Sequence, residues 1–113
     1  MKIIREQITL QELKQLAKTK FGDMVKCVAD IERKIMAVDA NLHADEETLL
    51  LEDGSKQENL WGFNIYPELP KEQWIEFDSM INLKPAQGNR SRSVENPAIQ
   101  AQIAEIANKL VKA

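Results

Sequence analysis

The chain has 113 residues and a mass of 12.9 kDa, which is enough for one domain and too little for two ordinary ones. Its formal net charge of −3 and its pI near 5.2 argue against bulk nucleic-acid binding. The chain contains no long uncharged apolar stretch and does not open on an apolar leader, so we expect neither a membrane span nor a signal peptide.

The N-terminal part of the chain predicts a short strand over residues 2–5 and then a helix. Thr9 and Glu12 have the spacing of a capping box, in which two side chains satisfy the first free amide groups of a helix. Phe21-Gly22 provides the helix stop. The apolar residues between these signals recur at helical spacing: Leu10, Leu13, Leu16 and Ala17.

Two patterns fit residues 23–39 about equally well. In the first, apolar and polar residues alternate from Val25 to Ile31, which predicts a strand, and Ile35–Val38 is the returning strand of a hairpin that turns at Arg33-Lys34. In the second, Asp23 caps a helix with one apolar stripe: Met24, Val28, Ile31, Ile35 and Val38. We favour the hairpin, and the helix stays open as an alternative.

The middle of the chain predicts one helix and two strands. Residues 45–53 begin with acids, which suit the positive end of a helix dipole, and continue with leucines up to Gly54. Residues 60–66 and 74–83 predict strands, joined by a connection that contains two prolines.

The C-terminal segment predicts a second long helix. Asn96 suits the N-cap position, Pro97 suits the first helical position, and an apolar stripe follows: Ile99, Ile103, Ile106 and Leu110. Helices therefore lie near both ends of the chain, with strands mostly between them. We predict a single α+β domain over residues 1–113, with two layers in which helices cover one face of a mostly antiparallel sheet.

Charge is distributed unevenly along the chain. From His43 to Glu58 six acids stand against Lys56 alone, a balance of −5, whereas Lys84 to Arg92 contains three bases and no acid. The plain interpretation is two solvated surfaces, which is the usual role of a charge run. The more specific interpretation makes the acidic segment a cation or partner site and the basic loop an anion site.

The only histidine stands beside three carboxylates, at the start of the acidic segment. Imidazole and carboxylate groups both bind divalent metals. The predicted metal ligands are His43, Asp45 and Glu47, with Asp30 or Asp78 as a more distant carboxylate. No second histidine follows at a zinc-motif spacing, and the alternative is a capping or surface histidine at a helix start.

The basic loop lies between a predicted strand and the last helix. Arg90 and Arg92 supply bidentate donors, Gly88 permits a close backbone approach, and the helix start adds partial positive charge. We therefore predict an anion site at four residues: Asn89, Arg90, Ser91 and Arg92. The loop has neither P-loop nor dinucleotide-binding spacing, and the alternative is a polar loop whose arginines pair with the acidic segment.

The remaining unusual residues have structural interpretations. The aromatic residues of 61–66, together with Trp74, are expected to be core or cross-strand neighbours. Cys27 is expected to be a small core residue, and as the single cysteine it cannot form an internal disulfide, which favours a reduced, cytoplasmic protein. Three polar residues of the second strand either line a pocket or face water: Asp78, Ser79 and Asn82.

Five segments together carry a resemblance to a known family: Leu42–Glu47, Gly54–Gln57, Leu60–Gly62, Phe77–Asn82 and Gly88–Arg92. In these segments the chain resembles a family of small bacterial proteins catalogued only as a domain of unknown function. The resemblance covers nearly the whole chain and implies a soluble bacterial protein of one domain. It implies no activity, since none is assigned to the family.

Three functional hypotheses follow. The first is a non-enzymatic binding module that engages an anionic small molecule or a protein partner through Arg90 and Arg92, and that can self-associate. The second is a metal-dependent hydrolase acting on a phosphate-bearing substrate, which requires the acidic segment and the basic loop to meet at one cleft. The third is a structural or regulatory subunit. The sequence requires no cofactor, and a divalent metal belongs only to the second hypothesis.

Overall fold

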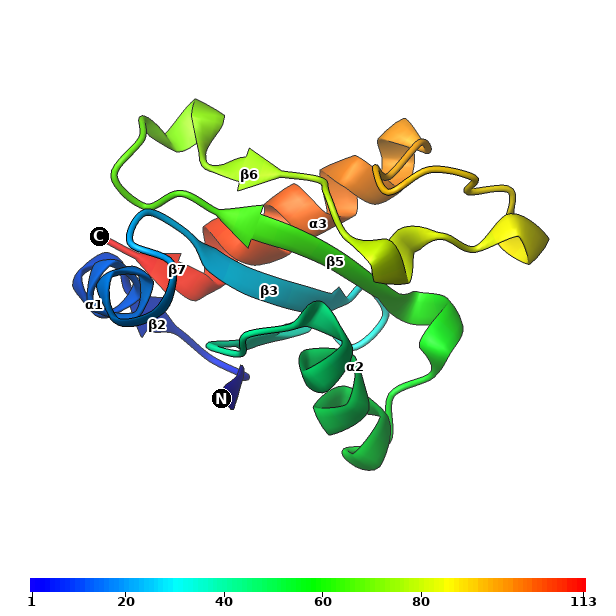
Figure 1. The fold of residues 1–113 in the computed structure, drawn as a ribbon, viewed down its shortest axis with the longest axis horizontal. Helices are drawn as coiled ribbons and strands as arrows, with labels where there is room; N and C mark the ends of the chain where they lie inside the picture. Colours follow the sequence, from blue (N-terminus) through cyan, green and yellow to red (C-terminus); the bar gives the residue numbers. More distant parts are fainter.

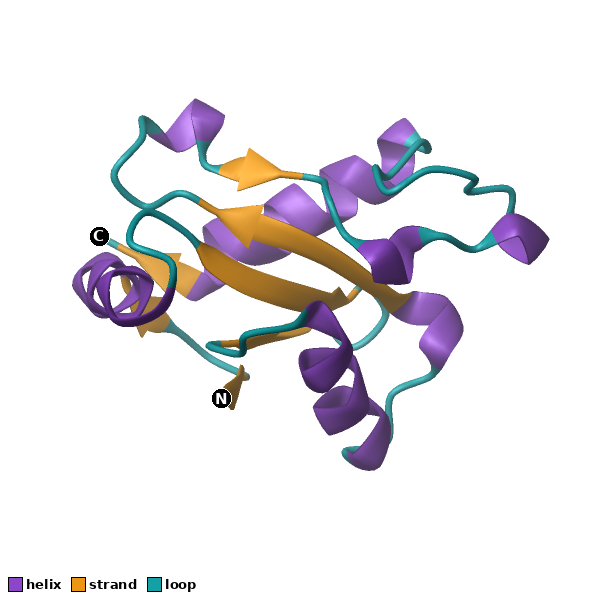
Figure 2. Ribbon diagram, viewed as in Figure 1, coloured by secondary structure: helices purple, strands orange, loops and turns teal.

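The computed structural model describes residues 1–113 and has a five-stranded antiparallel sheet with helices on both faces (Figures 1 and 2). The strand order is β1-β4-β3-β5-β6, with bounds β1 Lys2–Ile4, β3 Val25–Asp30, β4 Ile35–Val38, β5 Leu60–Ile65 and β6 Ile75–Glu76. The helices are α1 Leu10–Lys20, α2 His43–Glu52 and α3 Pro97–Leu110. A separate parallel pair joins β2 Ile8–Thr9 to β7 Val111–Lys112.

Four single turns of 3-10 helix complete the connections. They are η1 Gln57–Asn59, η2 Lys71–Gln73, η3 Met80–Asn82 and η4 Pro85–Gln87. The turns η2, η3 and η4 follow β5 in the chain. The segment between β5 and α3 therefore runs along the β6 edge of the sheet as short turns and loops. None of the helices is both long enough and apolar enough to cross a membrane.

The predicted α+β class and the mostly antiparallel sheet are confirmed. Helices α1 and α3 pack on one face of the sheet, over a core of 19 buried apolar residues. Helix α2 lies on the opposite face, so the helices do not all cover one face as predicted. There Leu50 packs on the strand residues Val28, Ala37 and Leu60, which point away from the main core because side chains alternate along a strand.

Residues 23–39 form the favoured hairpin, not the helix. Strand β3 lies between β4 and β5 and pairs with both, so the sheet buries it almost completely. At the turn the Asp30 carboxylate accepts hydrogen bonds from the backbone N–H groups of Glu32 (2.9 Å) and Arg33 (3.0 Å). Lys34 completes the turn with a left-handed φ of 59°.

Both long helices start at the predicted residues. Thr9 Oγ1 accepts from the backbone N–H of Glu12 at 3.1 Å, and Asn96 Oδ1 accepts from that of Ala98 at 2.8 Å. These caps act within four residues of sequence, which is why the sequence alone was sufficient to locate them.

The second predicted strand, residues 74–83, is mostly not a strand. Of these, only the residues of β6 pair with β5. Further along β5, the side chain of Asn82 forms the hydrogen bonds that a continued strand would have formed. Asn82 Oδ1 accepts from the Gly62 N–H at 2.8 Å, and Asn82 Nδ2 donates to the Gly62 carbonyl at 2.9 Å. A Cβ on Gly62 would lie 2.5 Å from Ser79 Oγ, so glycine is required for this close approach.

Candidate functional site

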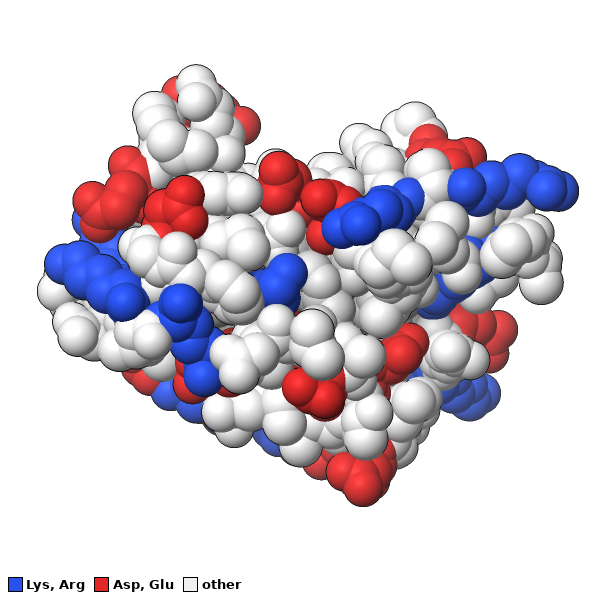
Figure 3. All heavy atoms as spheres, viewed as in Figure 1, with Lys and Arg blue, Asp and Glu red and all other residues white.

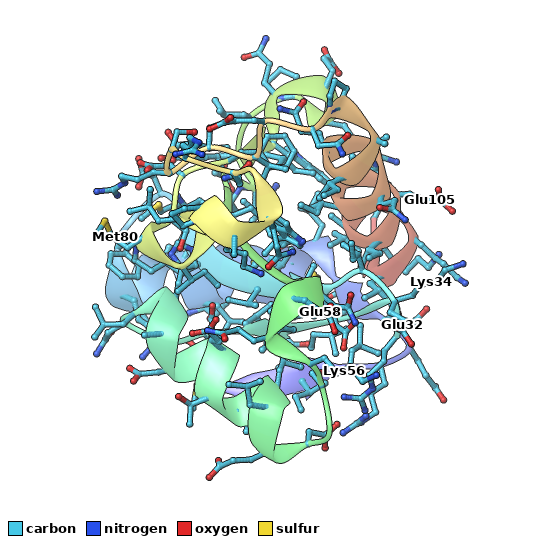
Figure 4. The ribbon with its side chains drawn as sticks, turned by 90° about the vertical axis from the view of Figure 1, so that its right-hand side faces the viewer. Glu32, Lys34, Lys56, Glu58, Met80 and Glu105 are labelled. Atoms are coloured by element: carbon cyan, nitrogen blue, oxygen red, sulfur yellow. The ribbon has the colours of Figure 1, made fainter.

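A pocket of about 270 Å³ opens on the face of the sheet that carries α2. We call it the α2 pocket. It is lined by Lys26, Leu42, His43, Ala44, Ser79, Met80, Ile81 and Arg92. Figure 3 looks onto this face, where uncharged atoms separate small groups of acidic and basic side chains. Figure 4 shows Met80 projecting from η3 on the side of the sheet opposite to α3 and its Glu105.

Helix α2 begins in this pocket without a side-chain cap. The helix starts at His43, two residues before the predicted start, and its N-cap is Leu42, which has no side-chain acceptor. The backbone N–H groups of His43 and Ala44 therefore have no acceptor within the protein. Free N–H groups at a helix start carry partial positive charge and favour an anion.

His43 is buried at the inner wall of the α2 pocket. Its Nε2 lies 2.9 Å from the carbonyl oxygen of Phe63. Since a carbonyl oxygen only accepts hydrogen bonds, Nε2 carries the proton and Nδ1 holds a lone pair. Burial lowers the pKa of His43 below its ordinary value of 6.5, with a further lowering from the charge of Lys26, while the bond to Phe63 acts in the opposite direction. The imidazole is therefore neutral at pH 7.

Two cations from distant parts of the chain line the pocket. Lys26 comes from β3, is half-buried and forms no ion pair, and its Nζ lies 5.2 Å from the centre of the Phe21 ring. Arg92 donates from Nε to Asp78 Oδ1 at 2.7 Å. This contact orients the guanidinium and leaves its two terminal nitrogens without a partner in the protein.

A buried asparagine fixes the path of the loop that carries Arg92. Asn89 Nδ2 donates to the carbonyl oxygens of Asn82 (2.8 Å) and Ser93 (2.7 Å), and Asn89 Oδ1 accepts from the Glu95 N–H at 2.8 Å. Asn82 Nδ2 in turn donates to the Arg92 carbonyl at 3.0 Å. Asn82 and Asn89 thus hold the loop against β5, with the Arg92 side chain directed to the pocket.

The four residues of the predicted anion site have different positions. Arg92 lines the α2 pocket, whereas Asn89 is buried in the loop scaffold. Ser91 Oγ accepts from the Ser93 N–H at 3.3 Å. Arg90 is exposed, lies outside the pocket lining and forms no ion pair. Neither arginine pairs with the acidic segment.

The three predicted metal ligands do not come together. His43 lines the α2 pocket, Asp45 lines a different hollow of about 400 Å³, and Glu47 lines neither. Of the two more distant carboxylates, Asp30 closes the β3–β4 turn and Asp78 pairs with Arg92. No three His, Cys, Asp or Glu side chains are arranged to hold a metal ion.

Sequence reasoning missed Lys26 as a pocket residue. In β3 it alternates with Val25 and Cys27, which face the main core, so it points to the α2 face together with Val28. That alternation was visible in the sequence and placed Lys26 on the opposite face from the core. Only the fold shows that His43 and Arg92 reach the same place.

Sequence reasoning also missed the burial of Glu46. Its carboxyl has no exposed surface, accepts one hydrogen bond from the Ala40 N–H at 3.1 Å through Oε2, and leaves Oε1 without a partner. Burial raises the pKa of Glu46 to about 10, so the group is neutral at pH 7. The available signal was its position one helical turn after His43, which places both side chains on the buried side of α2.

The basic loop and the acidic segment meet at Lys84. Its Nζ donates to the carbonyl oxygens of Gln57 and Leu60, both at 2.7 Å, and lies 4.4 Å from the centre of the Trp61 ring. Burial lowers the pKa of Lys84 to about 8. These contacts give Lys84 a structural role at the start of β5.

Comparison with known proteins gives a family but no activity. A family model described as "Protein of unknown function (DUF5674)" matches residues 2–110. This match confirms the resemblance to a domain of unknown function. No curated protein and no solved structure matches the chain.

Proposed function

Since the chain belongs to the DUF5674 family of proteins of unknown function, we propose from its geometry that it is a binding module, which holds a small anion in the α2 pocket. The observation that carries the proposal is the convergence of Lys26, Arg92 and the free N–H groups at the start of α2. These are the donors with which proteins bind carboxylate and phosphate groups.

The surroundings of the pocket favour an anion with an apolar part. His43 is neutral, so the positive charge at the pocket comes from Lys26 and Arg92, and the nearby Asp78 is already paired with Arg92. At the rim, Leu42 and Met80 are 59% and 61% exposed, which is unusual for large apolar side chains. The volume of about 270 Å³ lies near the lower end of the range for small-molecule pockets, so the ligand is small.

The proposal is tested by thermal unfolding in the presence of inorganic phosphate, pyrophosphate and a set of small carboxylates and phosphorylated metabolites. A ligand at about a hundred times its Kd adds about 2.7 kcal/mol to the free energy of unfolding, which raises Tm by several degrees in a domain of this size. Arg92→Ala and Lys26→Met should each reduce that rise, since each removes one cation.

Arg90→Ala is the matched control, because it removes an arginine of the same loop that lies outside the pocket. It should leave the rise in Tm unchanged. A rise that is lost in Arg90→Ala and kept in Arg92→Ala would place the anion on the loop surface and contradict the pocket. If none of the anions raises Tm, the proposal fails.

The two other hypotheses stay predictions. A metal-dependent hydrolase has no observation in its favour, since its predicted ligands His43, Asp45 and Glu47 do not converge. A structural or regulatory subunit would appear as a stable complex with another protein. A cytoplasmic location remains part of the proposal, supported by the single buried thiol of Cys27.

A further inference from the structure

The outer edge of β6 carries main-chain groups that no other part of the protein uses. Beside β6, the Tyr66 N–H donates to the Trp74 carbonyl at 2.9 Å. Along an antiparallel strand, the N–H and C=O groups of successive residues point alternately toward and away from the neighbouring strand. Since the Trp74 carbonyl points toward β5, the N–H and C=O groups of Ile75 and Phe77 point away from it. None of them has a hydrogen-bond partner within the protein.

The chain itself covers the next position along this edge. The Ser79 N–H, two residues beyond Phe77, donates to the Arg92 carbonyl at 3.0 Å. The loop around Arg92 therefore already lies beside the continuation of β6. Main-chain groups on this edge are therefore free only at Ile75 and Phe77. A short extended peptide is long enough to pair with both residues.

A groove of about 430 Å³ runs beside the open edge, between β6 and α3. Figure 1 shows β6 at the outer edge of the sheet, with α3 behind the sheet. The side chains of Ile75 and Phe77 form one wall, and Pro97, Ala101 and Ala104 of α3 form the other. Gln100 and Asn108 of α3 also line the groove, but Ala101 and Ala104 present only methyl groups, so an apolar side chain from outside has room beside them.

The other face of β6 carries a carboxylate that no cation compensates. Glu76 is exposed and accepts hydrogen bonds from Asn64 Nδ2 (2.9 Å) and the Tyr66 hydroxyl (3.0 Å), but it forms no ion pair. Glu72 and Lys71 both line the groove and neither forms an ion pair, so the groove itself carries no net charge. The charge of Glu76, on the face of β6 away from the groove, is complementary to a basic side chain of a partner.

We propose that the open edge of β6 binds an extended segment of a partner protein as an added strand. The segment alternates apolar and basic residues, because successive side chains of a strand point to opposite faces. The apolar side chain enters the groove beside α3, and the basic side chain lies beside Glu76. The main-chain groups of Ile75 and Phe77 supply affinity, while the groove and Glu76 supply selectivity.

The probe for this site is the synthetic peptide acetyl-Val-Lys-Val-Lys-Val-amide, added to the full ¹⁵N-labelled chain and followed by NMR. Up to about 1 mM peptide, we expect the amide resonances of Ile75 and Phe77 to shift and their hydrogen exchange to slow. A control peptide of the same sequence carries N-methyl groups on the amides that would face β6. It should bind at least about tenfold more weakly, because those amides cannot donate hydrogen bonds to the strand.

Two protein variants separate this site from a general loss of structure. Ala101→Trp fills the groove from an exposed position on α3 and should weaken binding at least about tenfold with little change in Tm. Gln102→Trp is the matched control, because this exposed neighbour lies outside the groove. Glu76→Lys should reverse the preference, so that acetyl-Val-Glu-Val-Glu-Val-amide binds better than the lysine peptide.

Three outcomes would overturn the proposal. The first is the absence of shifts at Ile75 and Phe77 up to about 1 mM peptide. The second is equal binding by the Ala101→Trp and Gln102→Trp proteins. The third is a shift of the same resonances on dilution without peptide, which would make a second copy of this chain the occupant. Lys26→Met should leave peptide binding unchanged, so this test is independent of the anion pocket.

Discussion

The two faces of the sheet are built from different kinds of residues. The face covered by α1 and α3 holds 19 buried apolar residues and no buried charge, whereas the apolar cluster under α2 has only five buried residues. The space beside that smaller cluster is filled by buried polar side chains, among them His43, Glu46, Asn64 and Asn82. Polar burial costs free energy unless each group is satisfied, and two of these groups keep an unpaired oxygen.

The difference teaches which face of the sheet contributes most of the stability and which face holds the anion pocket. Apolar burial contributes stability in proportion to area, and most of it lies under α1 and α3. The α2 face contributes less stability and holds the buried polar side chains named above. Three predictions test this division, from the largest expected effect to the smallest.

The largest effect is expected for Glu46→Gln, measured as stability against pH. The pKa of Glu46 is raised from its ordinary 4.5 to about 10 in the folded protein. The stability that the neutral carboxyl of Glu46 contributes to the folded state is therefore fully present below pH 4.5 and is lost as pH rises toward 10. From pH 5 to 9 the free energy of unfolding of the natural chain should fall by roughly 1 kcal/mol per pH unit relative to Glu46→Gln.

Urea unfolding at a series of pH values checks this prediction. Glutamine keeps an oxygen for the Ala40 N–H but does not titrate, so it removes the slope. Glu52→Gln, an exposed substitution at the end of the same helix, is the control and should keep the slope of the natural chain. Equal slopes for Glu46→Gln and the natural chain would mean that Glu46 ionises within the folded protein.

A smaller effect is expected from a cavity on the opposite face. Ile103 of α3 is fully buried in the main core, and Ile103→Ala should lower the free energy of unfolding by about 3 kcal/mol. Leu50→Ala empties a similar volume in the small cluster under α2 and should cost about 2 kcal/mol, because the polar surroundings can relax or admit water. A larger loss for Leu50→Ala than for Ile103→Ala would contradict the division between the faces.

The smallest effect on stability is expected for Asn82→Ala, which also changes binding. The substitution leaves the Gly62 N–H and C=O groups buried without partners and should cost about 2 kcal/mol in urea unfolding. Because Asn82 also holds the Arg92 carbonyl, the variant should weaken any phosphate-induced rise in Tm. Asn59→Ala, which removes an exposed side-chain contact, is the control and should change stability by less than about 1 kcal/mol.

If Asn82→Ala lowers stability but keeps the full response to phosphate, the loop path does not depend on this side chain. If Ile103→Ala lowers stability and also removes the response, the two faces are coupled. The second result would replace the separation of stability and binding with a single cooperative unit, whereas the first would contradict only the role of Asn82 in placing Arg92.

Much of the secondary structure could be predicted because its signals are local. Thr9 and Asn96 cap their helices with bonds to residues within three positions, and the alternation around Cys27 favoured a strand, although a helical stripe fitted the same residues. The strand predicted over residues 74–83 was wrong beyond Glu76, because the bonds that replace it join Asn82 to Gly62. That pairing spans twenty residues of sequence, and no local pattern predicts it.

The same distinction holds for the candidate site. The sequence by itself determined the α+β class, the two helix caps and a basic loop that contains Arg92, since each depends on neighbouring residues. It favoured the hairpin over residues 23–39 but left a helix open, and the pairing of β3 with β4 and β5 decided between them. Only the tertiary structure decided that Lys26, Ser79 and Arg92 meet at the start of α2, and that His43 and Glu46 are buried. Burial and convergence depend on how strands and helices pack across the whole chain, and it is packing that removes water and shifts a pKa.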